Sequence, residues 1–333
     1  MFKVIAICFG LLLSISWVNR GNALSDAEIS AFVSKTYIET NTGVQGTVSI
    51  TTPSSDPSVL ELSSNGVPDH ATGTFPSSSN PNSLEVQSYN WKIPKNPTYG
   101  TTTTCLPQGP IAMAVNGVPM FNPYSIGCCD TGVEELDLFD VCFGHPAPAP
   151  AGAYHYHLNP TCLFELKCNE PSTIIGVAFD GFPIYGPNDA DGTLLTTADL
   201  DECNGKVTNG EYRYHITNDF PYIMGCYNGT VRSDAGIQIS TNCQCTEVAN
   251  PCTEFGGRRR KKRAVTDISF QCCVDNVNCT TSEVTTGDSN IVSSASVTLV
   301  SSTSASTTSS AILFRSYFFL IISLSFISFK FQL

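Results

Sequence analysis

Two histidines lie one residue apart in the segment AGAYHYHLNP, residues 151–160, where they alternate with two tyrosines. Side chains alternate between the two faces of a β-strand, so we expect His155 and His157 on one face and the tyrosines on the other. Alternate Cα atoms of a strand are about 6.6 Å apart. Two imidazoles at that separation can reach one ion through bonds of about 2.0 to 2.1 Å. The spacing therefore predicts a pair of metal ligands.

A third ligand must come from another part of the chain, and the sequence offers two candidates. His145 opens the loop HPAPAPAG, which returns the chain towards the same strand, and His215 occupies the position of His157 in a second copy of the segment. We therefore predict one divalent transition metal, copper or zinc, on ligands drawn from His145, His155, His157 and His215. The alternative is that these tyrosines and histidines are only structural positions of a half-buried strand.

The second copy belongs to an internal repeat. Three phrases recur in the same order: residues 114–123 match 178–187, residues 138–145 match 199–206, and residues 152–159 match 210–217. We expect the repeats 111–162 and 174–226 to fold as related units around a pseudo-twofold axis. Arg213 replaces His155 and Lys206 replaces His145 in the second repeat, which argues for one asymmetric metal site.

The elements that position these residues are predicted to be strands. Short runs rich in β-branched and aromatic residues are separated by Gly, Pro, Asn and Ser at short spacing, as in all-β domains with many turns. Ser25 and Glu28 form a capping-box pattern that opens a short helix. We predict a mostly β, disulfide-rich, internally duplicated domain with few short helices, followed by a small cysteine-rich C-terminal module.

Cysteine usage indicates an oxidising compartment. Fifteen cysteines are present, and removal of Cys8 with a signal peptide leaves an even number, which favours disulfides. Eight of them fall between residues 105 and 226 and six between 243 and 279. The repeat favours the pairs Cys142–Cys162 and Cys203–Cys226, each closing the hairpin that carries a tyrosine/histidine strand.

Both ends of the chain resemble processing signals. Residues 1–23 combine a lysine, an apolar run and a small-residue exit, as in a secretory signal peptide. A Ser/Thr-rich stretch followed by a terminal apolar tail has the arrangement of a GPI-attachment signal, with the attachment residue between 301 and 306. The alternative for the tail is a single membrane-spanning helix. We expect an extracellular, cell-surface protein attached to the membrane through a lipid anchor.

Further modification sites follow from short motifs. Asn228 and Asn278 head N-glycosylation sequons. The run RRRKKRAV predicts cleavage between Arg263 and Ala264 by a furin-type proprotein convertase, and the alternative is a solvated or heparin-binding basic loop.

The charge balance limits the possible partners. The formal net charge is −12, and residues 24–257 hold 25 acidic and 7 basic side chains. Such a surface repels polyanions, so we exclude nucleic acid and expect an unknown extracellular partner. No Gly-x-Ser-x-Gly, phosphate-loop or His-Glu-x-x-His motif occurs, so no catalytic residue is assigned. The candidate functions are metal binding, an adhesion or matrix module, and a metal-dependent extracellular enzyme.

Several long phrases resemble one known family. FGHPAPAPAGAYHYHLNPTCL, IIGVAFDGFPIYGP and LDECNGKVTNGEYRYHITNDFPYIMGCYNG are similar to the YHYH domain family, which is named for the motif at 154–157. The resemblance implies domain identity and carries over no catalytic residue. The predicted organisation is a signal peptide (1–23), an N-terminal helix and lead-in strand (24–60), a YHYH domain (61–229), a cysteine-rich module (243–279) with a basic cleavage site (260–263), a Ser/Thr-rich stalk (280–310) and a hydrophobic tail (311–333).

Overall fold

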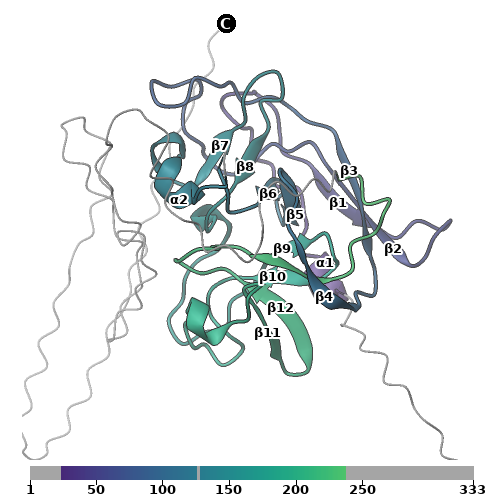
Figure 1. Ribbon diagram of the computed structural model, residues 1–333. Coiled ribbons are helices and arrows are strands. Elements are labelled where there is room, and N and C mark those ends of the chain that lie inside the picture. Colours follow the sequence, from purple (N-terminus) through teal and green to yellow (C-terminus); the bar gives the residue numbers. More distant parts are fainter. Residues whose placement is uncertain (1–23, 126–127, 238–333) are drawn as a thin grey trace, which may run out of the picture. The chain divides into compact units, whose positions relative to one another are not determined.

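The computed structural model describes residues 24–125 and 128–237 (Figure 1). The predicted signal peptide, cysteine-rich module, Arg263–Ala264 cleavage site, Asn278 sequon, stalk and tail lie outside these residues. Within the two described ranges, no helix is both long enough and apolar enough to cross a membrane. Strands dominate and the helices are short, so the predicted mostly β class is confirmed.

The largest sheet has eight strands. They are β5 (Pro110–Ala114), β6 (Pro119–Phe121), β7 (Gly144–Pro146), β8 (Tyr154–Tyr156), β9 (Ile174–Ala178), β10 (Pro183–Tyr185), β11 (Gly205–Thr208) and β12 (Glu211–His215). Their order in the sheet is β11-β12-β10-β9-β5-β6-β8-β7. The pairs β6–β8 and β10–β12 are parallel, and the other neighbours are antiparallel.

The strand order shows the internal duplication. Outward from the centre, β5-β6-β8-β7 on one side repeats β9-β10-β12-β11 on the other, with the same sequence of antiparallel and parallel pairs. The halves join where β5 and β9 pair antiparallel, with Met113 opposite Val177. An antiparallel pairing of equivalent strands is the arrangement that a twofold axis through the sheet produces.

Equivalent tight turns connect the central hairpins of the two halves. Gly117 follows β5 with a φ of 87°, and Gly181 follows β9 with a φ of 94°. This left-handed backbone favours glycine. A Cβ would also collide with the Ser64 hydroxyl at Gly117 and would lie 2.6 Å from the Pro94 carbonyl oxygen at Gly181. The glycines are therefore needed both for the turn and for the close approach of the neighbouring chain segments.

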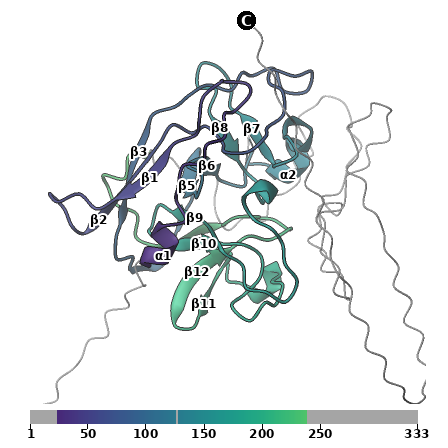
Figure 2. The same ribbon diagram turned by 180° about the vertical axis from the view of Figure 1, so that it is seen from behind.

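Two smaller sheets and five short helices complete the described chain (Figures 1 and 2). One sheet contains β1 (Val48–Thr51), β2 (Val59–Ser64) and β3 (Tyr89–Pro94), and the other pairs β4 (Tyr99–Cys105) with β13 (Cys226–Gly229). The helices are α1 (Asp26–Ile29), α2 (Thr131–Glu134) and the 3-10 turns η1 (Leu136–Leu138), η2 (Thr161–Leu163) and η3 (Thr197–Asp199). The predicted capping box is present, because the Ser25 and Glu28 side chains each accept from the other's backbone N–H.

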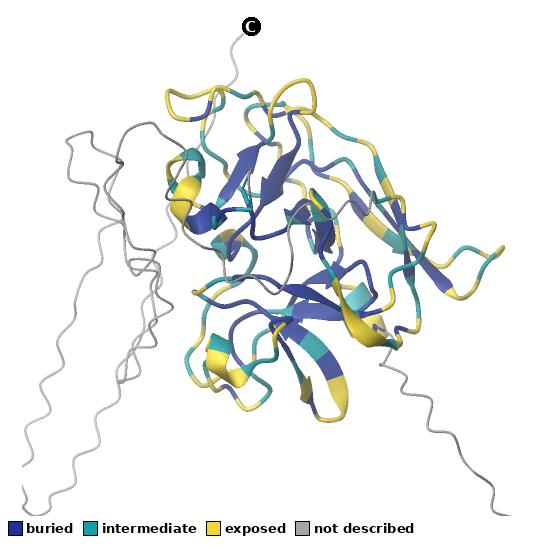
Figure 3. Cartoon of the chain, in the orientation of Figure 1, coloured by how far each residue is buried: buried dark blue, intermediate teal, exposed yellow. Residues whose placement is uncertain are grey.

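The middle of the large sheet is buried on both faces (Figure 3). All five residues of β9 are buried, which explains its continuous apolar sequence IIGVA. The alternating tyrosines and histidine of β8 are likewise buried on both faces of the strand, so the alternation does not separate a buried face from an exposed one. Tyr154 and Tyr156 are fully buried on one side and His155 is 3% exposed on the other, so every polar atom of this strand needs a partner inside the protein.

Candidate metal centre

Two buried tyrosines fix the strands that carry the histidines. The Tyr154 hydroxyl donates to Asp140 Oδ2 at 2.7 Å, and Asp140 Oδ1 accepts from the backbone N–H groups of Cys142 and Gly144. In the second half, the Tyr212 hydroxyl donates to Asp201 in the same way at 2.9 Å. Each aspartate therefore joins β8 or β12 to the loop that precedes the neighbouring edge strand.

A second tyrosine in each half forms a hydrogen bond with the residue that precedes the turn glycine, Asn116 in the first half and Asp180 in the second. Asn116 Nδ2 donates to the Tyr156 hydroxyl at 3.1 Å, and the equivalent Tyr214 hydroxyl donates to Asp180 at 2.6 Å. Burial raises the pKa of Asp180 to about 6, although hydrogen bonds from Tyr214 and from backbone N–H groups oppose this. These contacts give Asn116 and Asp180 the same structural role.

Three of the five histidines lie close together at strands β7 and β8. His145 on β7 lies opposite His155 on β8, and His157 follows directly after β8. The Nε2 atom of His155 is 3.1 Å from that of His145 and 3.0 Å from that of His157. All three are buried. Their ligand atoms lie close enough together to hold a single metal ion.

Backbone carbonyl groups fix the tautomers of two of these rings. His155 Nδ1 lies 2.8 Å from the Ala153 carbonyl oxygen, and His157 Nδ1 lies 2.6 Å from that of Asn122. A carbonyl oxygen only accepts, so each Nδ1 must carry the hydrogen. In the neutral ring the Nε2 lone pair is then free and points into the cluster, which is the orientation of a metal-bound histidine whose outer nitrogen is hydrogen-bonded.

Aromatic rings pack against the cluster, and burial lowers the pKa values of its three histidines. Phe121 stacks on His155 with ring centroids 3.9 Å apart, and the Phe139 ring lies 4.6 Å from that of His145. Burial, together with His157, lowers the pKa of His145 to about 3, and burial lowers the pKa of His157 to about 4. Burial and both neighbouring rings also hold the pKa of His155 well below its usual value. Near neutral pH all three rings are therefore uncharged.

One carboxylate lies at the side of the cluster. Glu135, between α2 and η1, places Oε2 3.6 Å from His145 Nε2 with its side chain 17% exposed. Burial raises the pKa of its carboxyl group, against a hydrogen bond from Ser125. Nothing in the segment GVEELDLFD singles out Glu135 among the acidic residues, because its proximity to His145 arises only in the fold.

The second half keeps the geometry and changes the chemistry. His215 Nδ1 lies 2.8 Å from the Gly186 carbonyl oxygen, equivalent to the His157–Asn122 contact. Arg213, at the position of His155, lies 4.4 Å above the ring of Tyr185. Lys206, at the position of His145, bonds Asp189 at 2.6 Å. His215 is therefore separate from the three-histidine cluster and lies among cationic side chains.

The other predicted sites within the described residues are two disulfides and one glycosylation sequon. Cys142 is bonded to Cys162 and Cys203 to Cys226, the two pairs that the repeat favours, and the other four cysteines between 105 and 226 are also in disulfides. Asn228 lies on β13 with intermediate exposure. His70, the fifth histidine, contacts the Tyr156 hydroxyl and the Cys142–Cys162 disulfide.

These features define a class of protein: a duplicated, disulfide-bonded β domain with a buried trihistidine cluster in one half only. A family model described as YHYH protein matches residues 90–195 and 189–229, so the chain carries a domain of the YHYH family. The match begins at residue 90, within the span 61–229 predicted for this domain. No curated protein and no solved structure matches the chain.

Proposed function

We propose that His145, His155 and His157 bind one divalent transition-metal ion, and that metal binding is the function of the first repeat. The observation that carries the proposal is the convergence of three buried Nε2 atoms on one point. Zinc and copper are the candidate ions, because both are bound readily by imidazole nitrogen.

The physical argument concerns unshared electron pairs. His155 and His157 each direct a bare nitrogen lone pair at the other from 3.0 Å, and a buried polar atom without a partner is unfavourable. A cation between them would satisfy both. Three nitrogens bound tetrahedrally to zinc at about 2.0 to 2.1 Å would lie about 3.3 Å apart, close to the 3.1 and 3.0 Å that separate His155 Nε2 from the Nε2 atoms of His145 and His157.

Glu135 supports a second candidate function, a metal-dependent enzyme. Three protein ligands leave a fourth position, which in catalytic zinc sites holds water or substrate. A carboxylate with a raised pKa close to a ligand, as Glu135 is to His145, is the usual type of acid or base for activating such a water. If Glu135 instead completes the coordination, the site is closed and structural. No reaction is assigned.

The cellular setting is proposed on the sequence features alone. The signal-like N-terminus, the GPI-like tail and the many cysteines support an extracellular, membrane-anchored protein that a proprotein convertase processes and that carries glycans at Asn228 and Asn278. An extracellular partner of the acidic surface belongs to the same proposal.

Metal content tests the proposal directly. The full-length chain is purified without a histidine tag, treated with chelator, reloaded with Zn²⁺ or Cu²⁺, desalted and measured by ICP mass spectrometry. We expect one ion per chain in the wild type and near zero in H155A/H157A. His215→Ala is the matched control, because His215 is equivalent to His157 in the half that lacks the cluster, and it should keep the ion. A wild type that takes up neither metal would overturn the proposal.

A further inference from the structure

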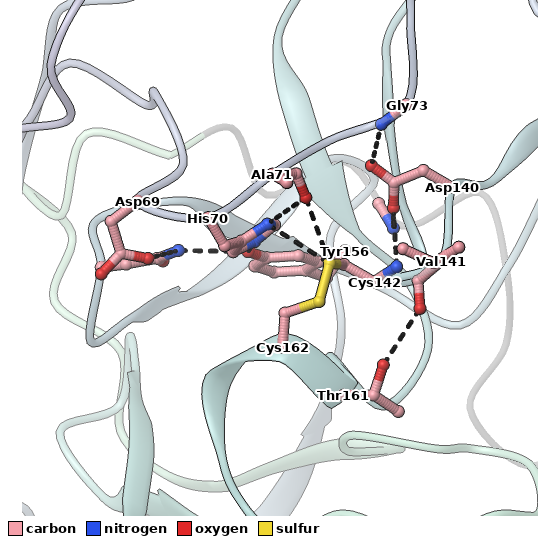
Figure 4. The surroundings of a disulfide bond; sticks show 12 residues. Asp69, His70, Ala71, Gly73, Asp140, Val141, Cys142, Tyr156, Thr161 and Cys162 are labelled. Atoms are coloured by element: carbon pink, nitrogen blue, oxygen red, sulfur yellow. Dashed lines mark hydrogen bonds between the residues drawn. A yellow bond between two sulfur atoms is a disulfide. The ribbon is translucent and has the colours of Figure 1, made fainter. Parts of the chain in front are cut away.

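Figure 4 shows the surroundings of the disulfide Cys142–Cys162, whose two cysteines differ in exposure to solvent. Cys142 is fully buried, whereas Cys162, in the turn η2, is exposed. A thiolate attacks one sulfur of a disulfide and expels the other, so access to the attacked sulfur and stability of the expelled one set the rate. The exposed end offers Cys162 to an incoming thiol, and the buried end makes Cys142 the leaving group.

A histidine ring stands against the buried sulfur. His70 Nδ1 lies 3.3 Å from Cys142 Sγ and 2.9 Å from the Ala71 carbonyl oxygen. Its other nitrogen, Nε2, lies 2.6 Å from the Tyr156 hydroxyl. His70 therefore links this hydroxyl to the sulfur of Cys142, as Figure 4 shows.

The hydrogen-bond chain behind His70 assigns its tautomer. Asn116 Nδ2 donates to the Tyr156 oxygen, which leaves the Tyr156 hydroxyl hydrogen for His70 Nε2. With Nε2 accepting, Nδ1 carries the hydrogen of the neutral ring. That N–H is shared between the Ala71 carbonyl and Cys142 Sγ, and it is in place to stabilise negative charge on the sulfur.

The second repeat supplies an internal comparison. Cys203 and Cys226 are separated by 23 residues, against 20 for the first bridge, but both of these cysteines are buried. His70 precedes both repeats, so the second bridge has no counterpart of it at an equivalent position. The two bridges therefore differ in access, and His70 contacts a sulfur of the first bridge, while the loops that they close are similar in length.

We propose that Cys142–Cys162 is a site of thiol–disulfide exchange with an external thiol, in which His70 stabilises the departing Cys142 thiolate. The external thiolate attacks Cys162 Sγ, a new S–S bond forms to Cys162, and the Cys142–Cys162 bond breaks with its electron pair going to Cys142 Sγ. A second external thiolate then releases Cys162. The protein disulfide is reduced by two electrons, and two thiols are oxidised to one disulfide.

The same residues do not form a second metal site in this state. His70, Cys142 and Cys162 lie close enough to hold an ion, but the two sulfurs are bonded to each other, and a thiolate is the form that binds metal. The test is therefore run with chelator present, so that metal capture by the reduced form cannot be mistaken for exchange.

The experiment follows the two bridges in one molecule. The folded full-length chain is exposed to reduced glutathione at neutral pH, quenched by alkylation at intervals and mapped by peptide mass spectrometry. We expect Cys142–Cys162 to open at least about tenfold faster than Cys203–Cys226, with the first glutathione adduct on Cys162. Equal rates for the two bridges, or a first adduct on Cys142, would overturn the proposal.

Two variants test the role of His70. His70→Ala removes the hydrogen bond to the leaving sulfur and should slow opening about tenfold. His70→Asn retains a side-chain N–H near the position of Nδ1 and should keep most of the wild-type rate. Thermal melting of each variant checks the fold. A His70→Ala protein that melts like the wild type and exchanges at the wild-type rate or faster would contradict the assignment.

Discussion

The three clustered histidines are held unequally at the scale of single residues. His155 and His157 each donate from Nδ1 to a backbone carbonyl, whereas the nearest partner of His145 Nδ1 is the Asn80 amide nitrogen at 3.4 Å. Outer hydrogen bonds orient metal-bound imidazoles. His145 is therefore the ring that has most freedom to adjust when an ion enters.

The metal-free protein should lose stability in acid because of these rings. The pKa of His145 is about 3 and that of His157 about 4 in the fold, against about 6.5 in an unfolded chain. Above about pH 6.5 these rings are uncharged in both the folded and the unfolded protein. As the pH falls towards 4, the unfolded chain binds protons that the buried rings do not, so the free energy of unfolding falls by an amount on the order of 3 kcal/mol for each ring. Chemical unfolding of chelated protein from pH 7 to 4 measures this loss.

The control for this prediction is His145→Gln, which cannot titrate at that position. Its stability should fall less steeply with acid than that of the wild type. Bound zinc should move the wild-type loss to lower pH, because protons must then compete with the ion. Identical pH profiles for the wild type and the variant would contradict the assignment of the loss to the cluster.

Glu135 should tune the metal site without being essential to it. Glu135→Gln removes the carboxylate that lies 3.6 Å from His145, and we expect about tenfold weaker zinc binding with one ion still bound at saturation. Competition with a coloured chelator measures the affinity. Glu134→Gln, at the exposed neighbouring position, is the matched control and should bind as the wild type does.

At the scale of elements, each half depends on a buried tyrosine–aspartate bond. Tyr154→Phe leaves Asp140 without its 2.7 Å donor, and Tyr212→Phe does the same to Asp201. Each change should cost about 1 to 3 kcal/mol of unfolding free energy, measured by chemical unfolding. Only Tyr154→Phe should also weaken zinc binding, because only β7 and β8 carry the cluster. Equal loss of zinc affinity in both variants would argue against this separation.

Part of this arrangement could be predicted from the sequence. The His-x-His spacing and the loop after His145 indicate the three residues that meet, and the repeat indicates the duplication and two disulfide pairs. The alignment of His215 with His157 also suggests His215 as a ligand, but alignment within a repeat places residues in equivalent positions, not in contact. Glu135 and His70 approach the sites through long-range packing, which no local pattern encodes.

At the scale of the whole molecule, the second half should accept a metal site. Lys206→His with Arg213→His would place three histidines, with His215, on the backbone positions equivalent to those of the cluster. We expect two zinc ions per chain by ICP mass spectrometry. Lys206→Gln with Arg213→Gln is the control and should bind one. A folded double-histidine variant that still binds a single ion would show that the two halves differ in more than these side chains.

The pairing of β5 with β9 has a consequence for the ancestry of the domain. A single repeat would expose β5 as an unpaired edge, and two identical copies joined along that edge would form a twofold homodimer. Fusion of two such copies into one chain preserves the antiparallel pairing of β5 with β9. It also allows the sequence of each half to diverge independently of the other. The histidines of one half and the arginine and lysine of the other are the divergence that such a fusion permits.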